Sequence, residues 1–167
     1  DERRTRFDFS HFEPVTPEQI AEIERRVNEQ ILQNDDARAR VMDMDSALKE
    51  GAMALFGEKY GSEVRVLNIG DSVELCGGTH VRRTGDIGMF KIVSESGVAS
   101  GVRRIEAITG PGVLTYLYER ENKLREVAEM LRTNPEEVPR KVEQLTQRLK
   151  GLEKELDMTV LVASAVK

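Results

Sequence analysis

The sequence predicts an α+β fold with a mostly antiparallel sheet and packed helices, followed by a C-terminal helical hairpin or coiled-coil segment. Three observations predict this. Stretches of alternating apolar and polar residues are interspersed irregularly with stretches of helical periodicity. Two of the expected strands, 88–93 and 101–109, are separated only by a short glycine- and serine-rich stretch. After residue 112 the apolar residues recur at helical spacing alone. This order favours an α+β fold over repeated βαβ units.

The first expected elements are a strand and a long helix. Residues 5–11 alternate, which predicts a strand with Phe7 and Phe9 on one face. Thr16 is a suitable N-cap, Pro17 suits the first helical position, and Gln19 completes a capping box. An apolar stripe then continues the helix to about residue 34.

The middle of the chain predicts three further strands around a short helix. Residues 37–44 and 63–69 alternate, and a turn at 70–71 leads to a short strand through Val73 and Leu75. Between them, Ser46 is expected to cap a helix that runs through Met53 and Leu55 and ends at Gly57 or Gly61.

The last part of the chain predicts a hairpin and then two helices. The strands 88–93 and 101–109 are joined by an expected loop at 94–101. A helix of about twenty residues follows, until Thr133-Asn134-Pro135 interrupts it. Apolar residues then alternate spacings of three and four, which predicts a coiled-coil seam: Val142, Leu145, Leu149, Leu152, Leu156 and Thr159. We therefore expect one domain at 1–110 and a helical segment at 111–167.

Composition limits the function classes. The single cysteine excludes an internal disulfide and suits a reducing cytoplasm. No apolar run approaches the ~18 residues of a membrane span, so no membrane partner is expected. The net charge is −5, but residues 76–110 hold a local basic strip that suits a phosphate backbone: Arg82, Arg83, Lys91, Arg103 and Arg104.

The strongest chemical candidate is the turn that runs from Cys76 to His80. Thiolate and imidazole are preferred zinc ligands, and two intervening glycines favour a tight turn in which both reach one ion. A structural zinc site needs four ligands, and His11 is a conceivable third. The alternatives are a buried cysteine near an unrelated histidine, or a nucleophilic Cys76 with His80 as its base. His11 itself is equally consistent with a packed histidine at a strand end.

A second candidate is the 94–101 loop with its flanking arginines. Gly97 and Gly101 permit close backbone approach to a ligand, and Arg103 and Arg104 could hold a phosphate. An ordinary hairpin loop explains the same residues.

Four blocks of sequence are hard to explain generically. Residues 6–12 read RFDFSHF, 51–61 read GAMALFGEKYG, 71–80 read DSVELCGGTH and 97–107 read GVASGVRRIEA. In this order they resemble consecutive signatures of the bacterial-type alanyl-tRNA synthetases, over about residues 6–110. The helical tail resembles the linker between the editing domain and the C-terminal tRNA-contacting domain of that family.

The resemblance implies that residues 1–110 are an editing region without its N-terminal part, which hydrolyses serine or glycine wrongly attached to tRNA(Ala). It implies Zn²⁺ as cofactor, with Cys76 and His80 as two ligands. The other two come from an upstream H-x-x-x-H motif that these 167 residues do not contain. ATP and Mg²⁺ belong to the aminoacylation domain of the parent enzyme, so the isolated chain is expected to be inactive.

The implied partner is tRNA(Ala), above all its aminoacylated 3′ end, and Gly97, Gly101, Arg103 and Arg104 are candidate contacts. Self-association through the C-terminal helices is a further expectation, although the seam could instead fold against the neighbouring helix. Two rival hypotheses are a free-standing deacylase acting in trans and a non-catalytic coiled-coil interaction module.

Overall fold

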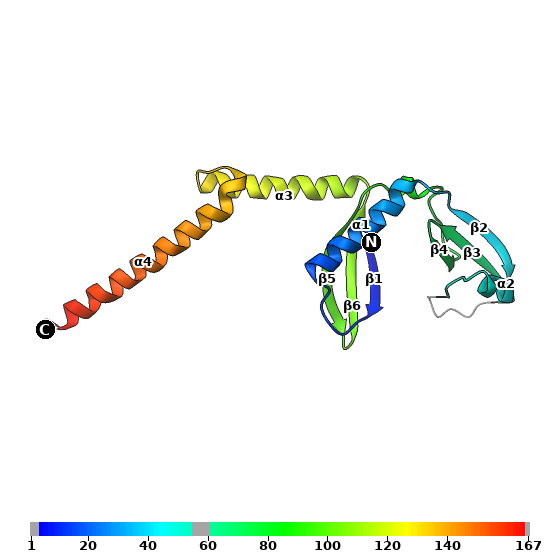
Figure 1. Ribbon diagram of the computed structural model, residues 1–167, viewed down its shortest axis with the longest axis horizontal. Helices are drawn as coiled ribbons and strands as arrows, with labels where there is room; N and C mark the ends of the chain where they lie inside the picture. The colour runs from blue at the N-terminus through cyan, green and yellow to red at the C-terminus, as the bar shows by residue number, and fades with distance from the viewer. Residues whose placement is uncertain (1–3, 55–60, 166–167) are drawn as a thin grey trace. The chain divides into compact units, whose positions relative to one another are not determined.

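The computed structural model describes the backbone of residues 4–54 and 61–165, and side chains as far as residue 159. The chain divides into two compact units, Asp1–Thr115 and Tyr116–Lys167. The first contains all six described strands, in two separate sheets, and the second is helical (Figure 1). The predicted α+β class with antiparallel pairing is therefore confirmed, with two small sheets where the sequence suggested one.

The first sheet has the order β1-β6-β5, with strands β1 (Thr5–Ser10), β5 (Phe90–Ala99) and β6 (Val102–Thr109). Both neighbouring pairs are antiparallel. Helix α1 (Pro17–Gln33) packs against β5, as Figure 1 shows. The sheet thus pairs the start of the chain with residues almost a hundred positions away, which only tertiary folding can decide.

Helix α1 begins and ends as local chemistry predicts. Thr16 Oγ1 accepts from the Gln19 amide, and Gln19 Oε1 accepts from the Thr16 amide, so the predicted capping box is confirmed. At the other end Asn34 adopts the left-handed conformation, with φ of 57°. Asparagine tolerates that conformation better than most residues, so the helix ends there.

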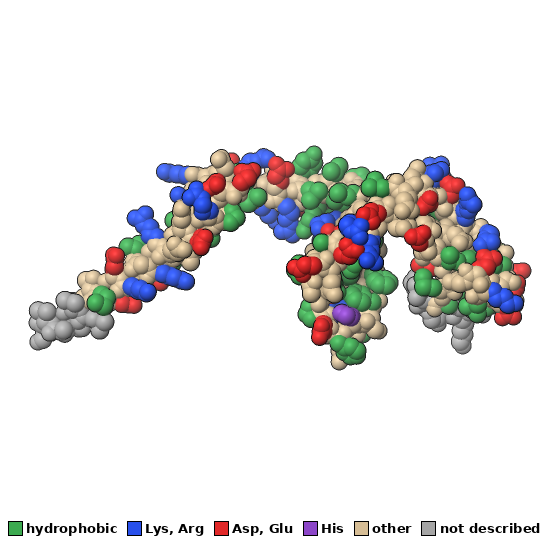
Figure 2. Space-filling view, in the orientation of Figure 1, with side chains coloured by type: hydrophobic (Ala, Val, Ile, Leu, Met, Phe, Trp, Pro, Cys, Tyr) green, Lys and Arg blue, Asp and Glu red, His purple; other side chains and the backbone are tan. Residues whose placement is uncertain are grey.

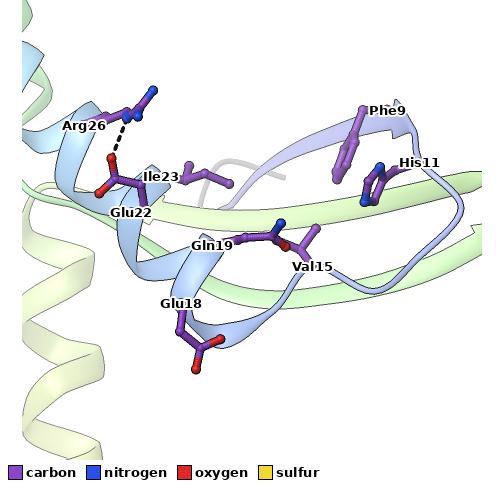
Figure 3. Close-up of a pocket in the computed structure, with 8 residues that line it drawn as sticks. All are labelled: Phe9, His11, Val15, Glu18, Gln19, Glu22, Ile23 and Arg26. Carbon is purple, nitrogen blue, oxygen red and sulfur yellow. Dashed lines mark hydrogen bonds and ion pairs between the residues drawn. The ribbon is translucent and has the colours of Figure 1, made fainter.

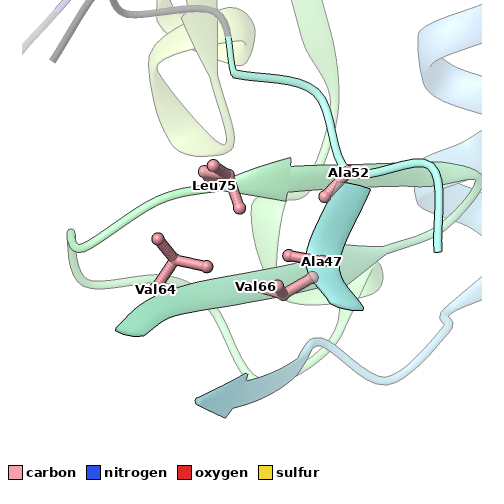
Figure 4. Packing of buried hydrophobic residues seen from close by; sticks show 5 residues of the cluster. All are labelled: Ala47, Ala52, Val64, Val66 and Leu75. Carbon is pink, nitrogen blue, oxygen red and sulfur yellow. The ribbon is translucent and has the colours of Figure 1, made fainter. Parts of the chain in front are cut away.

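The second sheet has the order β2-β3-β4, with strands β2 (Arg38–Asp43), β3 (Glu63–Ile69) and β4 (Ser72–Leu75), all antiparallel. Helix α2 (Met44–Lys49) lies on it. Figure 4 shows the core between them, where small and branched side chains meet: Ala47, Ala52, Val64, Val66 and Leu75. Leu75 is 2% exposed, so the residue just before Cys76 is anchored in this core.

The predicted extent of the middle helix is wrong. The N-cap is Asp43, whose side chain accepts from the Ser46 amide at 2.9 Å, and the helix ends at Lys49. Gly51, with φ of +82°, turns the chain away, and Met53 then pairs with β4 through two backbone hydrogen bonds. These two bonds pair the Met53 amide and carbonyl with the edge of β4, so the backbone there is satisfied without a further helical turn. The predicted helical residue Leu55 lies outside the described residues.

The predicted 94–101 loop is also wrong, because β5 continues through Ala99. Two irregularities in pairing, between Ile92 and Ser94 and between Gly97 and Ala99, let the strand stay in register with β6. Only Ser100 and Gly101 form the turn, and Gly101 adopts φ of +67°.

A short 3₁₀ helix, η1 (Thr84–Ile87), joins the two sheets. Thr84 is 4% exposed, and its hydroxyl accepts from the Asp35 amide and donates to the Ile31 carbonyl. Beyond η1, a Cβ placed on Gly88 would lie 2.9 Å from the Gly110 Cα. Both glycines have positive φ, so two backbone turns approach as closely as their missing side chains allow.

The tail is helical, as the sequence predicts. Helix α3 (Pro111–Met130) is followed by a 3₁₀ turn, η2 (Pro135–Glu137), and by α4 (Val138–Ala165). The predicted break at residues 133–135 is confirmed. Among the described residues no helix has the length and apolar character of a membrane span.

Candidate functional site: the Cys76–His80 turn

The Cys76–His80 turn leaves the edge strand β4 immediately after its buried end, Leu75. Cys76 is a free, half-buried thiol and His80 is exposed. A Cβ placed on Gly78 would lie 3.7 Å from Cys76 Sγ and 3.9 Å from His80 Cε1. The thiol and the imidazole therefore converge on one side of Gly78, with the donor types that zinc prefers.

The turn is tied to the second sheet by one side chain. Arg65 in β3 donates from Nη1 to the Cys76 carbonyl at 2.9 Å and to the Gly78 carbonyl at 2.7 Å. The Cys76 amide in turn donates to the Arg65 carbonyl at 3.1 Å. Neither composition nor motif predicted this role, because the sequence places Arg65 only on the polar face of an alternating strand.

The structure does not bring His11 into the turn. His11 follows β1 in the other sheet, where its ring stacks on Phe9 with centroids 6.3 Å apart and its amide donates to the Gly101 carbonyl. Within residues 4–54 and 61–165, no three His, Cys, Asp or Glu side chains form a group that could hold a metal ion. The described chain therefore offers two donors at the turn, half of a tetrahedral set.

His11 instead lines an open hollow of about 540 Å³ between β1 and the start of α1. Figure 3 shows Phe9 and His11 side by side on one wall. The α1 wall carries Glu22. Hydrogen bonds from Arg25 and Arg26 lower the pKa of Glu22 to about 2. The full lining is Phe9, His11, Val15, Glu18, Gln19, Glu22, Ile23 and Arg26.

The two arginines of the β5–β6 hairpin, Arg103 and Arg104, each form an ion pair. Arg103 donates twice to Glu95, at 2.5 and 2.6 Å, in a pair whose side chains are 16% and 8% exposed. Arg104 makes the same kind of fork with Asp8 on β1. The hydrogen bond from Arg103 lowers the pKa of Glu95 below its ordinary 4.5. The folded state therefore gains from this pair above that ordinary value, and loses the gain as the pH falls through the lowered one.

The two hairpin glycines leave room for neighbouring side chains. A Cβ on Gly97 would lie 3.2 Å from Arg103 Nη1, and one on Gly101 would lie 2.9 Å from the Phe12 ring. These contacts account for both glycines locally. Whether Gly97, Gly101, Arg103 or Arg104 also contacts RNA stays a prediction.

Most of the predicted basic strip is paired as well. Arg83 contacts Asp36 at 2.9 Å and donates to the Asn34 carbonyl, while Lys91 pairs with Glu24 at 2.8 Å. Arg82 is 94% exposed and has only a 3.9 Å approach to Asp86. The positive charge beside the Cys76–His80 turn therefore comes from Arg82 and from Arg65, whose guanidinium bonds the turn's carbonyls.

The Cys76–His80 turn lies within a stretch of the chain that matches a known protein family. Residues 64–106, which include it, match the family described as the threonyl and alanyl tRNA synthetase second additional domain. The alanine–tRNA ligase of Ralstonia nicotianae is 59% identical over 157 residues, which cover 94% of this chain. Those of Paracidovorax citrulli and Bordetella pertussis are 61% and 57% identical over 92% and 99% of the chain. Over nearly its whole length the chain matches a segment of the alanyl-tRNA synthetases.

The chain spans 18% of the length of the Ralstonia ligase and 19% of the Bordetella ligase. The resemblance to alanyl-tRNA synthetases that the four sequence blocks indicated is thus confirmed across nearly the whole chain. The match to the second additional domain includes the turn, Arg65, Arg82 and the β5–β6 hairpin.

The synthetase segment also carries an exposed apolar seam on α4. Its five apolar members are about half exposed, between 45% and 64%, and Thr159 is exposed as well: Val142, Leu145, Leu149, Leu152 and Leu156. Figure 2 shows acidic and basic side chains of both signs along the same helix. Such a stripe between charged flanks is typical of a helix that packs against another helix.

Proposed function

We propose that this segment contributes part of an editing site that hydrolyses serine or glycine wrongly attached to tRNA(Ala). The observation that carries the proposal is the convergence of Cys76 and His80 within the stretch that matches the second additional domain. The proposed cofactor is Zn²⁺, held here by the Cys76 thiolate and the His80 imidazole. Two further ligands would come from the H-x-x-x-H motif expected elsewhere in the ligase.

The turn suits this role by its exposure. Residues 77–80 are exposed, and among the described residues other than its chain neighbours no atom lies within 4 Å of a Cβ placed on Gly77, so the bulky 3′ end of a tRNA has room to approach. Arg82, exposed and two residues beyond His80, would attract the phosphate backbone. The chemistry supplied by a bound zinc ion is orientation of the ester and activation of water.

Editing corrects the limited selectivity between alanine, serine and glycine that an aminoacylation site can reach by itself. Alanine differs from serine by one hydroxyl and from glycine by one methyl group, and differences of this size give only about 1–3 kcal/mol of discrimination. A second, hydrolytic site removes what the first has accepted. We accordingly propose that the parent ligase attaches alanine with ATP and Mg²⁺ in the cytoplasm, and that the isolated chain is inactive.

The test uses the full-length ligase that carries this sequence. We expect Cys76→Ser and His80→Ala to lose stoichiometric zinc, measured by elemental analysis, and to lose hydrolysis of serine-charged tRNA(Ala). Attachment of alanine should be retained, because that reaction belongs to another domain.

The chain's other histidine provides the matched control, since His11 lies in the other sheet. His11→Ala should keep its zinc. Unchanged zinc and unchanged deacylation in both turn variants would contradict the proposal and favour the non-catalytic interaction module. Deacylation by the 167-residue chain alone would instead favour the free-standing deacylase.

We also propose that the exposed α4 seam mediates self-association. In a parallel pair of α4 helices, heptad spacing places Arg148 of one copy near Glu153 of the other, beside the Leu149 and Leu152 layers. Opposite charges flanking an apolar seam favour a second copy of the same helix.

Substituting the seam should reduce the oligomeric mass of the full-length ligase. We expect Leu149→Lys with Leu152→Lys to dissociate it, measured by sedimentation equilibrium, because a buried charge in each layer is costly. The control Gln147→Lys adds a charge outside the seam and should leave the mass unchanged. A wild-type ligase that is already monomeric would show that α4 packs within its own chain.

A further inference from the structure

The Cys76–His80 turn has little of its own to hold it in shape. Two of its five residues are glycines, and residues 77–80 are exposed. None of the described backbone hydrogen bonds outside helices and strands begins or ends at residues 77–81. Left to itself, such a segment would sample many conformations, and ordering it would cost roughly 1–2 kcal/mol per residue. Its shape must therefore come from contacts outside the turn.

Arg65 supplies those contacts. The register places it beside the end of β4, where Val66 lies opposite Leu75 and the Cys76 amide donates to the Arg65 carbonyl. From this position its guanidinium reaches back and binds the carbonyls of Cys76 and Gly78 together. These two carbonyls lie on either side of the Gly77–Gly78 peptide bond, in the middle of the turn. Holding them fixes the direction in which Cys76 Sγ and His80 face Gly78.

Arg65 differs from several other arginines of the first unit in the groups that it bonds. Other arginines of the first unit, including Arg40, Arg83, Arg103 and Arg104, pair with carboxylates. Arg65 has no carboxylate within ion-pair distance among the described residues. A half-buried guanidinium that binds peptide carbonyls instead gives up the stronger charge-assisted pairing with an anion. The hydrogen bonds that Arg65 makes with its side chain are therefore bonds to the turn.

We propose that Arg65 is a positioning residue for the metal ligands: it orders the turn so that Cys76 and His80 are already placed to bind one ion. This inference rests on the proposed zinc site. It assigns to Arg65 no contact with metal or substrate. Groups that orient metal ligands from outside the coordination sphere typically change metal affinity by about 10–100-fold when they are removed.

The test replaces zinc with cobalt in the full-length ligase, because a cobalt–thiolate bond gives a charge-transfer absorption that reports on Cys76 directly. We expect Arg65→Met to weaken cobalt binding by about 10–100-fold in competition with a chelator, and to shift or broaden the thiolate band. Arg65→Lys keeps a donor at shorter reach and should recover part of the affinity. The matched control is Arg40→Met on the adjacent strand β2, which breaks an ion pair with Glu50 and should change neither readout.

The outcomes separate this inference from the proposal on which it rests. Cobalt affinity and a thiolate band in Arg65→Met equal to those of the unaltered ligase would overturn the positioning role, while Cys76→Ser still loses the band. If Cys76→Ser keeps the band, the metal proposal fails and this inference with it. If Arg65→Met also unfolds the β2-β3-β4 sheet, shown by hydrogen exchange, the Arg65→Lys variant decides: intact exchange with native affinity contradicts the inference, and intact exchange with weakened affinity supports it.

Discussion

Replacing Gly88 with valine is expected to destabilise the first unit by at least about 3 kcal/mol. Gly88 has φ of +70° and ψ of −159°, a conformation essentially restricted to glycine. A Cβ there would also lie 2.9 Å from the Gly110 Cα, and that neighbour is backbone, which cannot rotate away. Strain and clash therefore act together at the point where η1 enters β5.

The effect should be visible as faster amide hydrogen exchange in β5 and η1 of the full-length ligase, by roughly a hundredfold for 3 kcal/mol. Gly112→Ala is the control, because outside its chain neighbours and its own helix backbone no atom of the described residues lies within 4 Å of its Cβ position, and its φ is not positive. That variant should exchange like the unaltered protein. Normal protection in Gly88→Val would show that the two turns can separate at little cost.

Replacing Asn28 with leucine is expected to loosen α1 from the first sheet by about 2–6 kcal/mol. Asn28 donates to the Phe90 carbonyl and accepts from the Phe90 amide, both at 2.9 Å. Because β5 is an edge strand, these backbone groups have no partner strand on that side. Leucine keeps the branched shape but leaves both groups half-buried and unpaired, at about 1–3 kcal/mol each.

The measurement is again hydrogen exchange, at the Phe90 amide and its neighbours in β5. Asn28→Asp retains an acceptor for the Phe90 amide and should fall between leucine and the unaltered protein. The control Asn122→Leu, on the exposed surface of α3, tests the same substitution without a strand beneath it. Equal exchange of Phe90 in all of these variants would mean that Glu24, which also bonds the edge at Ile92, holds it alone.

The loss of protection should begin at β5 and not at the Cys76–His80 turn. The turn belongs to the second sheet, whose core of Val64, Val66 and Leu75 packs against α2 instead of α1. Zinc content should therefore respond to Arg65 far more than to Asn28, which gives the stability and metal experiments independent readouts.

The sequence by itself determined the elements whose signals are local. The start of α1 followed from Thr16, Pro17 and Gln19, since capping involves only residues three apart. The strand 63–69 and the break at 133–135 followed from alternation and from proline for the same reason. Cys76 and His80 stood out by their spacing and types, but their role as zinc ligands came from the resemblance and stays a prediction.

Tertiary structure decided the features that depend on distant partners. The helix expected to pass Met53 ended at Lys49, and Met53 bonded instead to the edge of β4. The expected loop at 94–101 became strand, because β6 offered a partner along its whole length. The arginines expected to meet phosphate were drawn into pairs with Asp8, Asp36 and Glu95, since a nearby carboxylate is a stronger partner than solvent. Arg65, an unremarkable residue of an alternating strand, came to hold the Cys76–His80 turn because the antiparallel register of β3 and β4 places it there.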